Sequence, residues 1–555
     1  MKPKNIFVFL LIIAGLAASV CGQNAVRPTE SGGPLMAEQA AYDVKSYDLA
    51  VGVDVAEHSI RGILTASVMY VKPLDKLVLD LDEALTVDSA HLVKGRMAVD
   101  LKFERRGGKI WIELGKTAKK GERIDVAVAY HGIPKVAPRP PWVGGFVWSK
   151  TKDGEPWFAT AVQMDGADLW WPVKDHPSDK PDTVKTHFTV PAPLVVASNG
   201  RLESVVDNPG GTRTYNWFVS QPISNYCIAM NVAPYKVIKD SVKSIGGDTI
   251  PIEFYVLPQD FDKGQSLVDK LKDYTRFFEQ YLGPYPFRAD KIGVAETPHL
   301  GMEHQTITAY GNEFRYDKNG FDWLLFHEFG HEWWANLVTA PDWNDFWIHE
   351  GFESFMDAFY AEKMLGREQF VKSLPQRIKS LKNLKPVAPR ESRTTTQMYM
   401  IPPEYVRSDG DIYGKGALVL NALRGYLGDD AFFRSLRRFT YPDPKMEKVT
   451  DGRQFHFGTT DDFLRIAEKQ SGKKLGWFFE LYLRQPALPK LVVEQTAEAL
   501  NLRWETPNNM PFPLPVEVKV NGETKRVAMT GNQGTLAIPA DAKVEIDPNG
   551  WLLKQ

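Results

Sequence analysis

Two histidines, His327 and His331, lie four residues apart, and Glu350 follows nineteen residues after the second. This spacing constrains the fold more than any other feature of the chain. In a helix, residues four apart project from one face, so both imidazole rings can point at one position. Glu350 lies in a second helix-like segment, where it shares a face with Ser354 and Asp357. If two helices bring the three side chains together, they form a site for a divalent metal ion with one open position.

Glu328 completes the motif His-Glu-x-x-His. The motif supplies two ligands and places a carboxylate beside the open coordination position. Zinc at a catalytic site takes three protein ligands and keeps the fourth position for water. The sequence therefore predicts one zinc ion bound by His327, His331 and Glu350.

The segments Phe326 to Trp334 and Ile348 to Phe352 resemble the aminopeptidase N type of zinc metallopeptidases, a gluzincin family that includes the leukotriene-hydrolase-like enzymes. That family carries His-Glu-x-x-His, then eighteen residues, then Glu in an Asn-Glu-Gly-Phe context. This chain matches the spacing in full, with His349 in place of Asn. The resemblance implies a zinc hydrolase in which Glu328 is the general base.

A second motif concerns the substrate. Gly301-Met302-Glu303-His304 resembles the family signature Gly-x-Met-Glu-Asn, and Tyr310 follows at a family-matching distance. The resemblance implies that Gly301, Met302 and Glu303 bind the substrate, and that Glu303 holds the free α-amino group of a peptide. A charge-assisted hydrogen bond of roughly 1.5–3 kcal/mol would select such substrates. The alternative for Glu303 is a solvated carboxylate at a strand edge, and His304 is expected to alter the first pocket or the pH profile.

Three further residues have assigned roles. Tyr413 lies in Tyr-Gly-Lys-Gly-Ala, which resembles a family segment and implies that its phenol stabilises the oxyanion of a tetrahedral intermediate. The alternative is a core tyrosine at a helix start. Gln163 resembles a family glutamine that lines the first substrate pocket, and the alternative is an amide that satisfies backbone groups. Asp357 is expected to be a solvated acid, with orientation of a ligand histidine as the alternative.

Hydrophobic periodicity divides the chain into regions. Alternation with period two over residues 41–245 predicts an N-terminal all-β domain. Helical patterns dominate residues 246–487, where the resemblance implies a thermolysin-like, mainly helical catalytic domain with a small sheet. Alternation returns over residues 488–555 and predicts a C-terminal β-sandwich. We therefore expect a multidomain α+β protein, without the large helical domain that follows in many relatives.

The N-terminus has the pattern of an export signal over residues 1–22. Lys2 and Lys4 precede an apolar run that is too short for a comfortable membrane span. The residues up to Cys21 partly resemble a bacterial lipoprotein box, in which the cysteine is lipidated, and cleavage after Gly22 is the open alternative. Residues 23–40 have the Gly-, Pro- and Ser-rich composition of a flexible tether. We expect an exported protein that is periplasmic, an outer-membrane lipoprotein or secreted.

Charge and cysteine content limit the partners. The chain has 67 basic and 69 acidic residues and no long run of either sign, so it lacks the electrostatic footprint of a nucleic-acid-binding protein. Membrane attachment is expected only through a lipid on Cys21, and the protein is expected to act as a monomer. Cys227 is then the one thiol left, so no internal disulfide forms and Cys227 is expected to be buried.

Together these features predict a zinc aminopeptidase that hydrolyses the first peptide bond of peptides with a free N-terminus. One alternative is a zinc endopeptidase or a bifunctional enzyme of the leukotriene-hydrolase kind. Another is a non-catalytic binding protein stabilised by zinc. Glu328 and Tyr413 argue against the latter, because a structural zinc site is normally closed by four ligands and needs neither residue.

Overall fold

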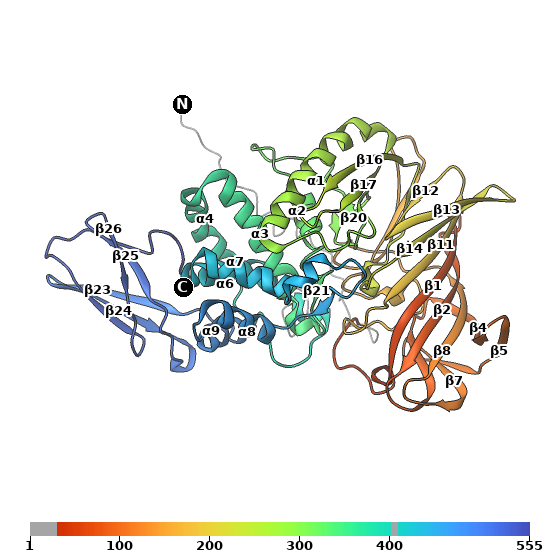
Figure 1. The fold of residues 1–555 in the computed structure, drawn as a ribbon, viewed down its shortest axis with the longest axis horizontal. Coiled ribbons are helices and arrows are strands. Elements are labelled where there is room, and N and C mark those ends of the chain that lie inside the picture. The colour runs from red at the N-terminus through yellow and green to blue at the C-terminus, as the bar shows by residue number, and fades with distance from the viewer. Residues whose placement is uncertain (1–29, 401–408) are drawn as a thin grey trace.

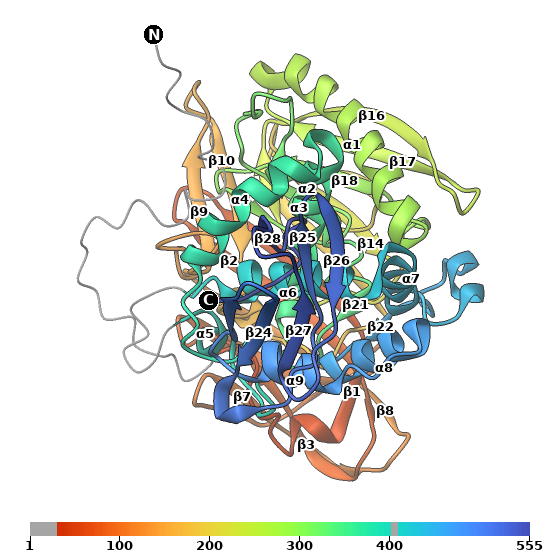
Figure 2. The same cartoon turned by 90° about the vertical axis from the view of Figure 1, so that its left-hand side faces the viewer.

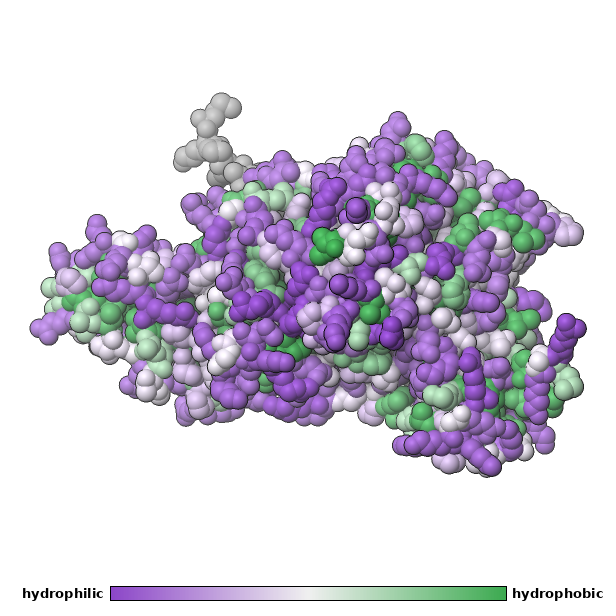
Figure 3. All heavy atoms as spheres, in the orientation of Figure 1, coloured by the Kyte–Doolittle hydropathy of each residue, from purple (hydrophilic) through white to green (hydrophobic). Residues whose placement is uncertain are grey.

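The computed structural model describes residues 30–400 and 409–555. The β-rich N-terminal region, the helices and the C-terminal sheets follow one another along the longest axis (Figure 1). The export signal expected over residues 1–22, with Cys21, lies outside the described residues. None of the described helices combines the length and apolar character needed to cross a membrane. On the face drawn in Figure 3, hydrophobic residues are scattered among hydrophilic ones.

The N-terminal region is built on one large sheet. Its strands are β1 (Tyr42–Asp54), β2 (Ser59–Tyr70), β4 (Leu85–Lys94), β5 (Met97–Asp100), β8 (Arg123–Gly132), β11 (Thr183–Pro191), β13 (Arg201–Asn208) and β14 (Thr212–Val219). They form the order β13-β14-β11-β1-β2-β8-β4-β5. In β8, Ile124, Val126 and Val128 are buried and alternate with more exposed residues, as the sequence pattern predicts.

Two smaller sheets complete this region. One has the order β3-β7-β6 and consists of β3 (Leu74–Asp80), β6 (Phe103–Arg106) and β7 (Lys109–Ala118). The other has the order β12-β15-β10-β9 and consists of β9 (Gly145–Lys150), β10 (Pro156–Ala161), β12 (Val195–Ala197) and β15 (Asn231–Ala233). The segment between β10 and β11 runs toward the catalytic region and carries Gln163.

The catalytic region begins with a five-stranded sheet of order β16-β17-β18-β20-β19. Its strands are β16 (Lys236–Lys243), β17 (Thr249–Val256), β18 (Ile292–Glu296), β19 (Gly301–Met302) and β20 (Thr308–Tyr310). The domain boundary that we expected between residues 245 and 246 falls in the turn between β16 and β17. These strands pair along their whole length, so β16 belongs to the catalytic sheet.

Helices form most of the catalytic region. They are α1 (Phe261–Leu282), α2 (Trp323–Gly330), α3 (Trp347–Leu365), α4 (Arg367–Ser380), α5 (Thr395–Tyr399), α6 (Asp411–Leu427), α7 (Asp429–Thr440), α8 (Thr460–Ser471) and α9 (Gly476–Arg484). A short parallel pair, β21 (Val338–Thr339) and β22 (His456–Phe457), lies between them. Aromatic rings pack α1 against α2, with the centroids of Phe278 and Phe326 4.6 Å apart.

The C-terminal region consists of two three-stranded antiparallel sheets. They contain β23 (Lys490–Gln495), β24 (Ala499–Glu505) and β27 (Gln533–Ala537), and β25 (Val516–Val520), β26 (Glu523–Val527) and β28 (Val544–Ile546). Figure 2 looks onto this end of the molecule. Asn421 on α6 donates a hydrogen bond to the carbonyl of Gly550 at 2.9 Å, which connects these sheets to the helices.

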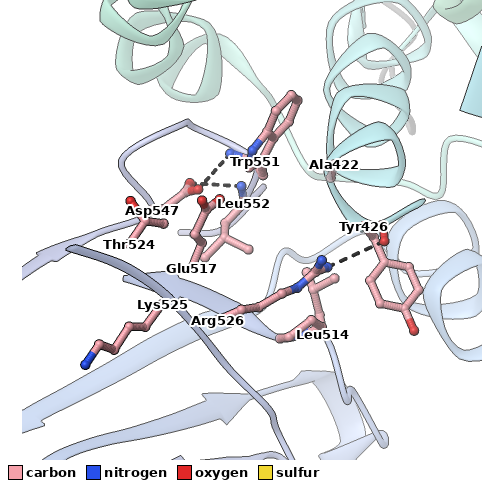
Figure 4. Close-up of a pocket in the computed structure, with 12 residues that line it drawn as sticks. Ala422, Tyr426, Leu514, Glu517, Thr524, Lys525, Arg526, Asp547, Trp551 and Leu552 are labelled. Carbon is pink, nitrogen blue, oxygen red and sulfur yellow. Dashed lines mark hydrogen bonds between the residues drawn. The ribbon is translucent and has the colours of Figure 1, made fainter. Parts of the chain in front are cut away.

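A pocket of about 180 Å³ lies at this junction (Figure 4). In it Asp547 accepts hydrogen bonds from the backbone amides of Trp551 and Leu552, and Arg526 donates to the carbonyl of Tyr426. No residue assigned to the predicted site lines this pocket. We therefore treat it as part of the contact between the helices and the C-terminal sheets.

Residues 30–40, the described part of the expected tether, pack against the body of the protein. Gly32 forms a β-bridge with Thr394, and the indole of Trp343 donates a hydrogen bond to the Ser31 hydroxyl at 3.3 Å. Gly32 has φ +82°, and a Cβ atom there would lie 2.0 Å from the Trp343 ring. Gly32 is needed here because only glycine allows this close contact. From the sequence alone, the glycine content of this segment indicated flexibility.

Lys180 joins the N-terminal region to the catalytic region. Its buried ammonium group donates hydrogen bonds to the carbonyl of Asn336 at 2.8 Å and to the hydroxyl of Thr339 at 2.7 Å. Both acceptors are neutral. Burial lowers the pKa of Lys180 to about 7, because charge is costly to desolvate without a paired carboxylate.

The pKa of Lys180 predicts a pH-dependent stability. Between about pH 7 and pH 10 the unfolded chain holds a proton on Lys180 that the folded protein lacks, so rising pH favours folding by up to about 1.4 kcal/mol per pH unit. Below about pH 7 both states are protonated and the contribution is constant. We expect the unfolding midpoint of the wild type to rise relative to that of Lys180→Met over this range. A difference that stays constant from pH 6 to pH 10 would contradict the assignment.

Candidate metal and substrate site

Helix α2, which carries His327 and ends at its C-cap residue His331, is fixed at its start by a cap. The side chain of Asp322 accepts a hydrogen bond from the backbone amide of Leu325 at 3.1 Å. The hydroxyl of Tyr310 and the amide of Asn312 also donate to this carboxylate. Tyr310, which the sequence placed at a family-matching distance, therefore ties β20 to the first turn of α2.

The structure brings the three expected metal ligands together. The Nε2 atoms of His327 and His331 are 3.3 Å apart, and Oε2 of Glu350 lies 3.6 Å from each of them. Oε2 is buried and accepts no hydrogen bond from the described residues. Three ligand atoms within 4.8 Å of one another, one of them a buried carboxylate oxygen without a donor, form a site for a cation.

The hydrogen bonds of both histidine rings involve Nδ1, which leaves Nε2 of each ring available to bind a metal ion. Nδ1 of His331 lies 2.8 Å from the carbonyl of Trp334, which only accepts, so Nδ1 carries the proton. Nδ1 of His327 lies 2.8 Å from Oδ2 of Asp357. Both Nε2 atoms face Oε2 of Glu350, and this set of two nitrogens and one oxygen fits zinc. Asp357 is thus not the solvated acid that we expected, because it contacts a ligand across two helices.

Close helix crossings place these side chains. A Cβ atom on Gly330 would lie 2.2 Å from the carboxylate of Glu353, so glycine allows α2 to approach α3. A Cβ atom on Gly351 would lie 3.0 Å from Cα of Gly416, so α3 and α6 also cross in near contact. The second crossing lies one residue after Glu350 on α3.

Tyr413 lies near the start of α6, on the metal side. Its ring is stacked on that of His327, with centroids 6.4 Å apart, and its hydroxyl lies 2.7 Å from the hydroxyl of Tyr399. Burial raises the pKa of Tyr413 well above its ordinary value, so the phenol keeps its proton and can donate it in a hydrogen bond. The sequence contained no motif that singled out Tyr399.

Glu303 and Gln163 meet in the same site. Oε1 of Glu303 accepts hydrogen bonds from the side-chain amide of Gln163 and from the hydroxyl of Tyr226, the latter at 2.9 Å. Burial raises the pKa of Glu303 above its ordinary value. Gly301 lets β19 approach the expected general base, since a Cβ atom there would lie 2.7 Å from Oε1 of Glu328. The sequence did not indicate Tyr226 as a site residue, because it lies 77 residues before Glu303 along the chain.

Glu328 and Met302 lie where the motifs placed them. Glu328 follows His327 on α2 and is partly exposed, whereas Met302 is buried on the edge strand β19. Burial, with Glu303 nearby, raises the pKa of Glu328 to about 8. A divalent cation held by the adjacent ligands opposes this rise, because it favours the ionised carboxylate.

The two histidines that replace family asparagines are both buried. Burial lowers the pKa of His304 to about 3, and burial with nearby His331 lowers that of His349 to about 3. Both rings are therefore neutral near pH 7. Nε2 of His349 accepts a hydrogen bond from the backbone amide of Ala340 at 3.0 Å, which fixes the loop between the metal-binding helices. The expected effect of His304 on the pH profile does not extend to neutral pH.

Two family descriptions match the chain. The peptidase family M1 domain covers residues 267–482, and the peptidase M1 N-terminal domain covers residues 44–227. The chain belongs to peptidase family M1. It is 26% identical to endoplasmic reticulum aminopeptidase 1 of Mus musculus, over 58% of this chain and 36% of that relative. It is 25% identical to probable aminopeptidase 2 of Sulfurisphaera tokodaii, over 68% of this chain and 49% of that relative. This M1 protein thus spans about a third to a half of these curated relatives.

Solved structures share the fold of this M1 protein. An M1 zinc metallopeptidase from Deinococcus radiodurans matches with a TM-score of 0.65 and 23% identity, over 81% of this chain and 95% of that one. A variant of it bound to a Tyr-Ser-Ala substrate matches with a TM-score of 0.66 and 22% identity, over 84% and 99% of the two chains. The expected fold class, with its β-rich N-terminal domain and helical catalytic domain, is confirmed.

The contact between Asp357 and His327 predicts an effect on metal binding. Loss of a carboxylate that orients a ligand histidine typically lowers metal affinity about 10- to 100-fold. We expect a loss of this size for zinc in Asp357→Ala, measured by competition with a chelator. Asp269→Ala, which removes an exposed carboxylate from α1, is the matched control and should bind zinc like the wild type. Equal affinity of both variants would mean that Asp357 does not support the metal site.

Proposed function

We propose that the protein is a zinc-dependent aminopeptidase that removes the first residue of peptides with a free N-terminus. The observation that carries the proposal is the connection between the amine-binding carboxylate and the metal ligands. Gln163 donates to Glu303, and the hydroxyl of Tyr399 lies 3.3 Å from Oε1 of Gln163 and 3.2 Å from Oε1 of Glu350. Both groups therefore lie in one site.

The residues of this chain have separate roles in the reaction. His327, His331 and Glu350 would hold zinc, which would supply a lowered pKa for a water molecule and polarisation of the scissile carbonyl. Glu328 takes a proton from the attacking water and later gives it to the leaving amine. Tyr413, held protonated by burial, donates a hydrogen bond to the developing oxyanion.

Glu303 limits the reaction to the end of a peptide. Its carboxylate is held by two donors, Tyr226 and Gln163, and attracts the ammonium group of the substrate. Among the strands of residues 30–400 and 409–555, β19 is at the edge of its sheet and pairs on one side only, so an extended peptide can pair on the other side. Because Gly301 on this strand lies against Glu328, the first peptide bond is the one within reach of the general base.

The relatives support this proposal. Several curated relatives are named aminopeptidases, and a structural neighbour is described with a bound tripeptide substrate. The ligand set of two histidines and one glutamate leaves an open position, which favours catalysis over a purely structural role for the metal. We infer short peptides with unblocked N-termini as the substrate class.

We also propose that the protein is exported and acts as a monomer. The charged start and apolar run of residues 1–22 support export. Contact with a membrane would then occur only through a lipid on Cys21, whereas cleavage after Gly22 would release the protein. Both routes end outside the cytoplasm.

Removal of the general base tests the mechanism. We expect Glu328→Gln to lower kcat/KM for unblocked dipeptides and tripeptides about 10²- to 10⁴-fold, because the carboxamide takes no proton from water. The zinc content should stay at that of the wild type, since Glu328 is not a ligand. Release of free amino acids and metal analysis check both statements, and chelation should also abolish release. A fully active Glu328→Gln would refute the assignment.

Blocked substrates test the role of Glu303. We expect the wild type to prefer a peptide with a free amine over its N-acetylated form by at least about 10- to 100-fold, the worth of one charge-assisted hydrogen bond. In Glu303→Gln this preference should fall toward unity, mainly through slower cleavage of the free peptide. If the wild type cuts both peptides equally fast, the protein is an endopeptidase rather than an aminopeptidase.

A further inference from the structure

Tyr399, at the C-terminal end of α5, contacts three residues of the site. Its hydroxyl lies 2.7 Å from the hydroxyl of Tyr413, 3.2 Å from Oε1 of Glu350 and 3.3 Å from Oε1 of Gln163. The side chain is 4% exposed. One buried phenol therefore joins a metal ligand, the expected oxyanion donor and a residue of the amine site.

The short helix α5 is held firmly enough to position this phenol. It begins with a capping box between Thr394 and Gln397, and the hydroxyl of Thr395 donates to the carbonyl of Met164 in the N-terminal region. The ammonium group of Lys385 donates to three carbonyls at the end of the helix, those of residues 397, 398 and 400. These contacts fix both ends of α5.

The two carboxylate oxygens of Glu350 have different surroundings. Oε2 faces the Nε2 atoms of both histidines and accepts no hydrogen bond from the described residues. Oε1 accepts from Tyr399. A hydrogen bond to one oxygen fixes the plane of the carboxylate, so Tyr399 keeps Oε2 turned toward the metal position.

Proton counting gives Tyr399 a second role. A phenol donates one hydrogen bond, and the oxygens of Glu350 and Gln163 only accept. In the resting arrangement Tyr399 donates to Oε1 of Glu350, the nearer of the two acceptors at 3.2 Å, and Tyr413 donates to Tyr399. When an oxyanion forms and Tyr413 turns its proton toward it, the oxygen of Tyr413 becomes an acceptor at 2.7 Å from Tyr399. A hydrogen bond from Tyr399 then strengthens Tyr413 as a donor.

We propose that Tyr399 is a positioning residue whose one proton orients the Glu350 carboxylate for zinc in the resting protein and supports Tyr413 in the transition state. The role toward Tyr413 rests on the proposed function, whereas the role toward Glu350 does not. A merely structural tyrosine would affect stability and leave metal affinity and kcat unchanged.

The variant Tyr399→Phe tests both parts. We expect zinc affinity, measured by chelator competition, to fall about 10- to 100-fold, and kcat to fall by a similar factor at saturating zinc, with KM nearly unchanged. Tyr482→Phe is the matched control: it removes another buried hydroxyl, which donates to the carbonyl of Leu553 at 2.7 Å, and should keep zinc affinity and kcat. Wild-type zinc affinity together with wild-type kcat in Tyr399→Phe would overturn the proposal.

A double variant separates the roles. If Tyr399 acts on the reaction through Tyr413, Tyr399→Phe with Tyr413→Phe should have the kcat of Tyr413→Phe alone, whereas zinc affinity should fall only where Tyr399 is replaced. Independent losses in kcat would refute the role toward Tyr413. Should the wild type hydrolyse no peptide, the proposed function would fail, and the zinc measurement would still decide the role toward Glu350.

Discussion

Two imidazoles facing one buried carboxylate are the arrangement on which the rest of this structure depends. Oε2 of Glu350 has lost its contact with water and gains no hydrogen bond from the described residues, which is unfavourable without a cation. A divalent ion offsets this cost directly. The glycine crossings of α2 with α3 and of α3 with α6 are therefore part of the metal chemistry, since a side chain at either crossing would push the ligands apart.

The N-terminal region is a structural part of the site. Gln163 and Tyr226 both come from it, and both donate to the same oxygen of Glu303 on the catalytic sheet. Lys180 adds a buried contact between the same two regions. The orientation of the Glu303 carboxylate is thus set by contacts that cross from the N-terminal region to the catalytic sheet.

The sequence alone predicted the features that depend on local periodicity. Helical spacing indicated the convergence of His327, His331 and Glu350, and strand alternation indicated the β-rich regions at both ends. It failed where a contact joins distant segments. Tyr226 and Tyr399 owe their positions to tertiary packing, and no spacing in the chain marks them. Helical spacing placed Asp357 on the face of Glu350 but did not show that it contacts His327 on another helix. The composition of residues 30–40 predicted a flexible tether, because composition does not show that Gly32 packs against the indole of Trp343.

The hydrogen-bonded series from Glu303 through Gln163 and Tyr399 to Tyr413 has a consequence for protein engineering. In the proposed mechanism, recognition of the peptide end and stabilisation of the reacting carbonyl depend on side chains that contact one another. A library that varies Gln163 to change which amino acid is accepted will also disturb turnover.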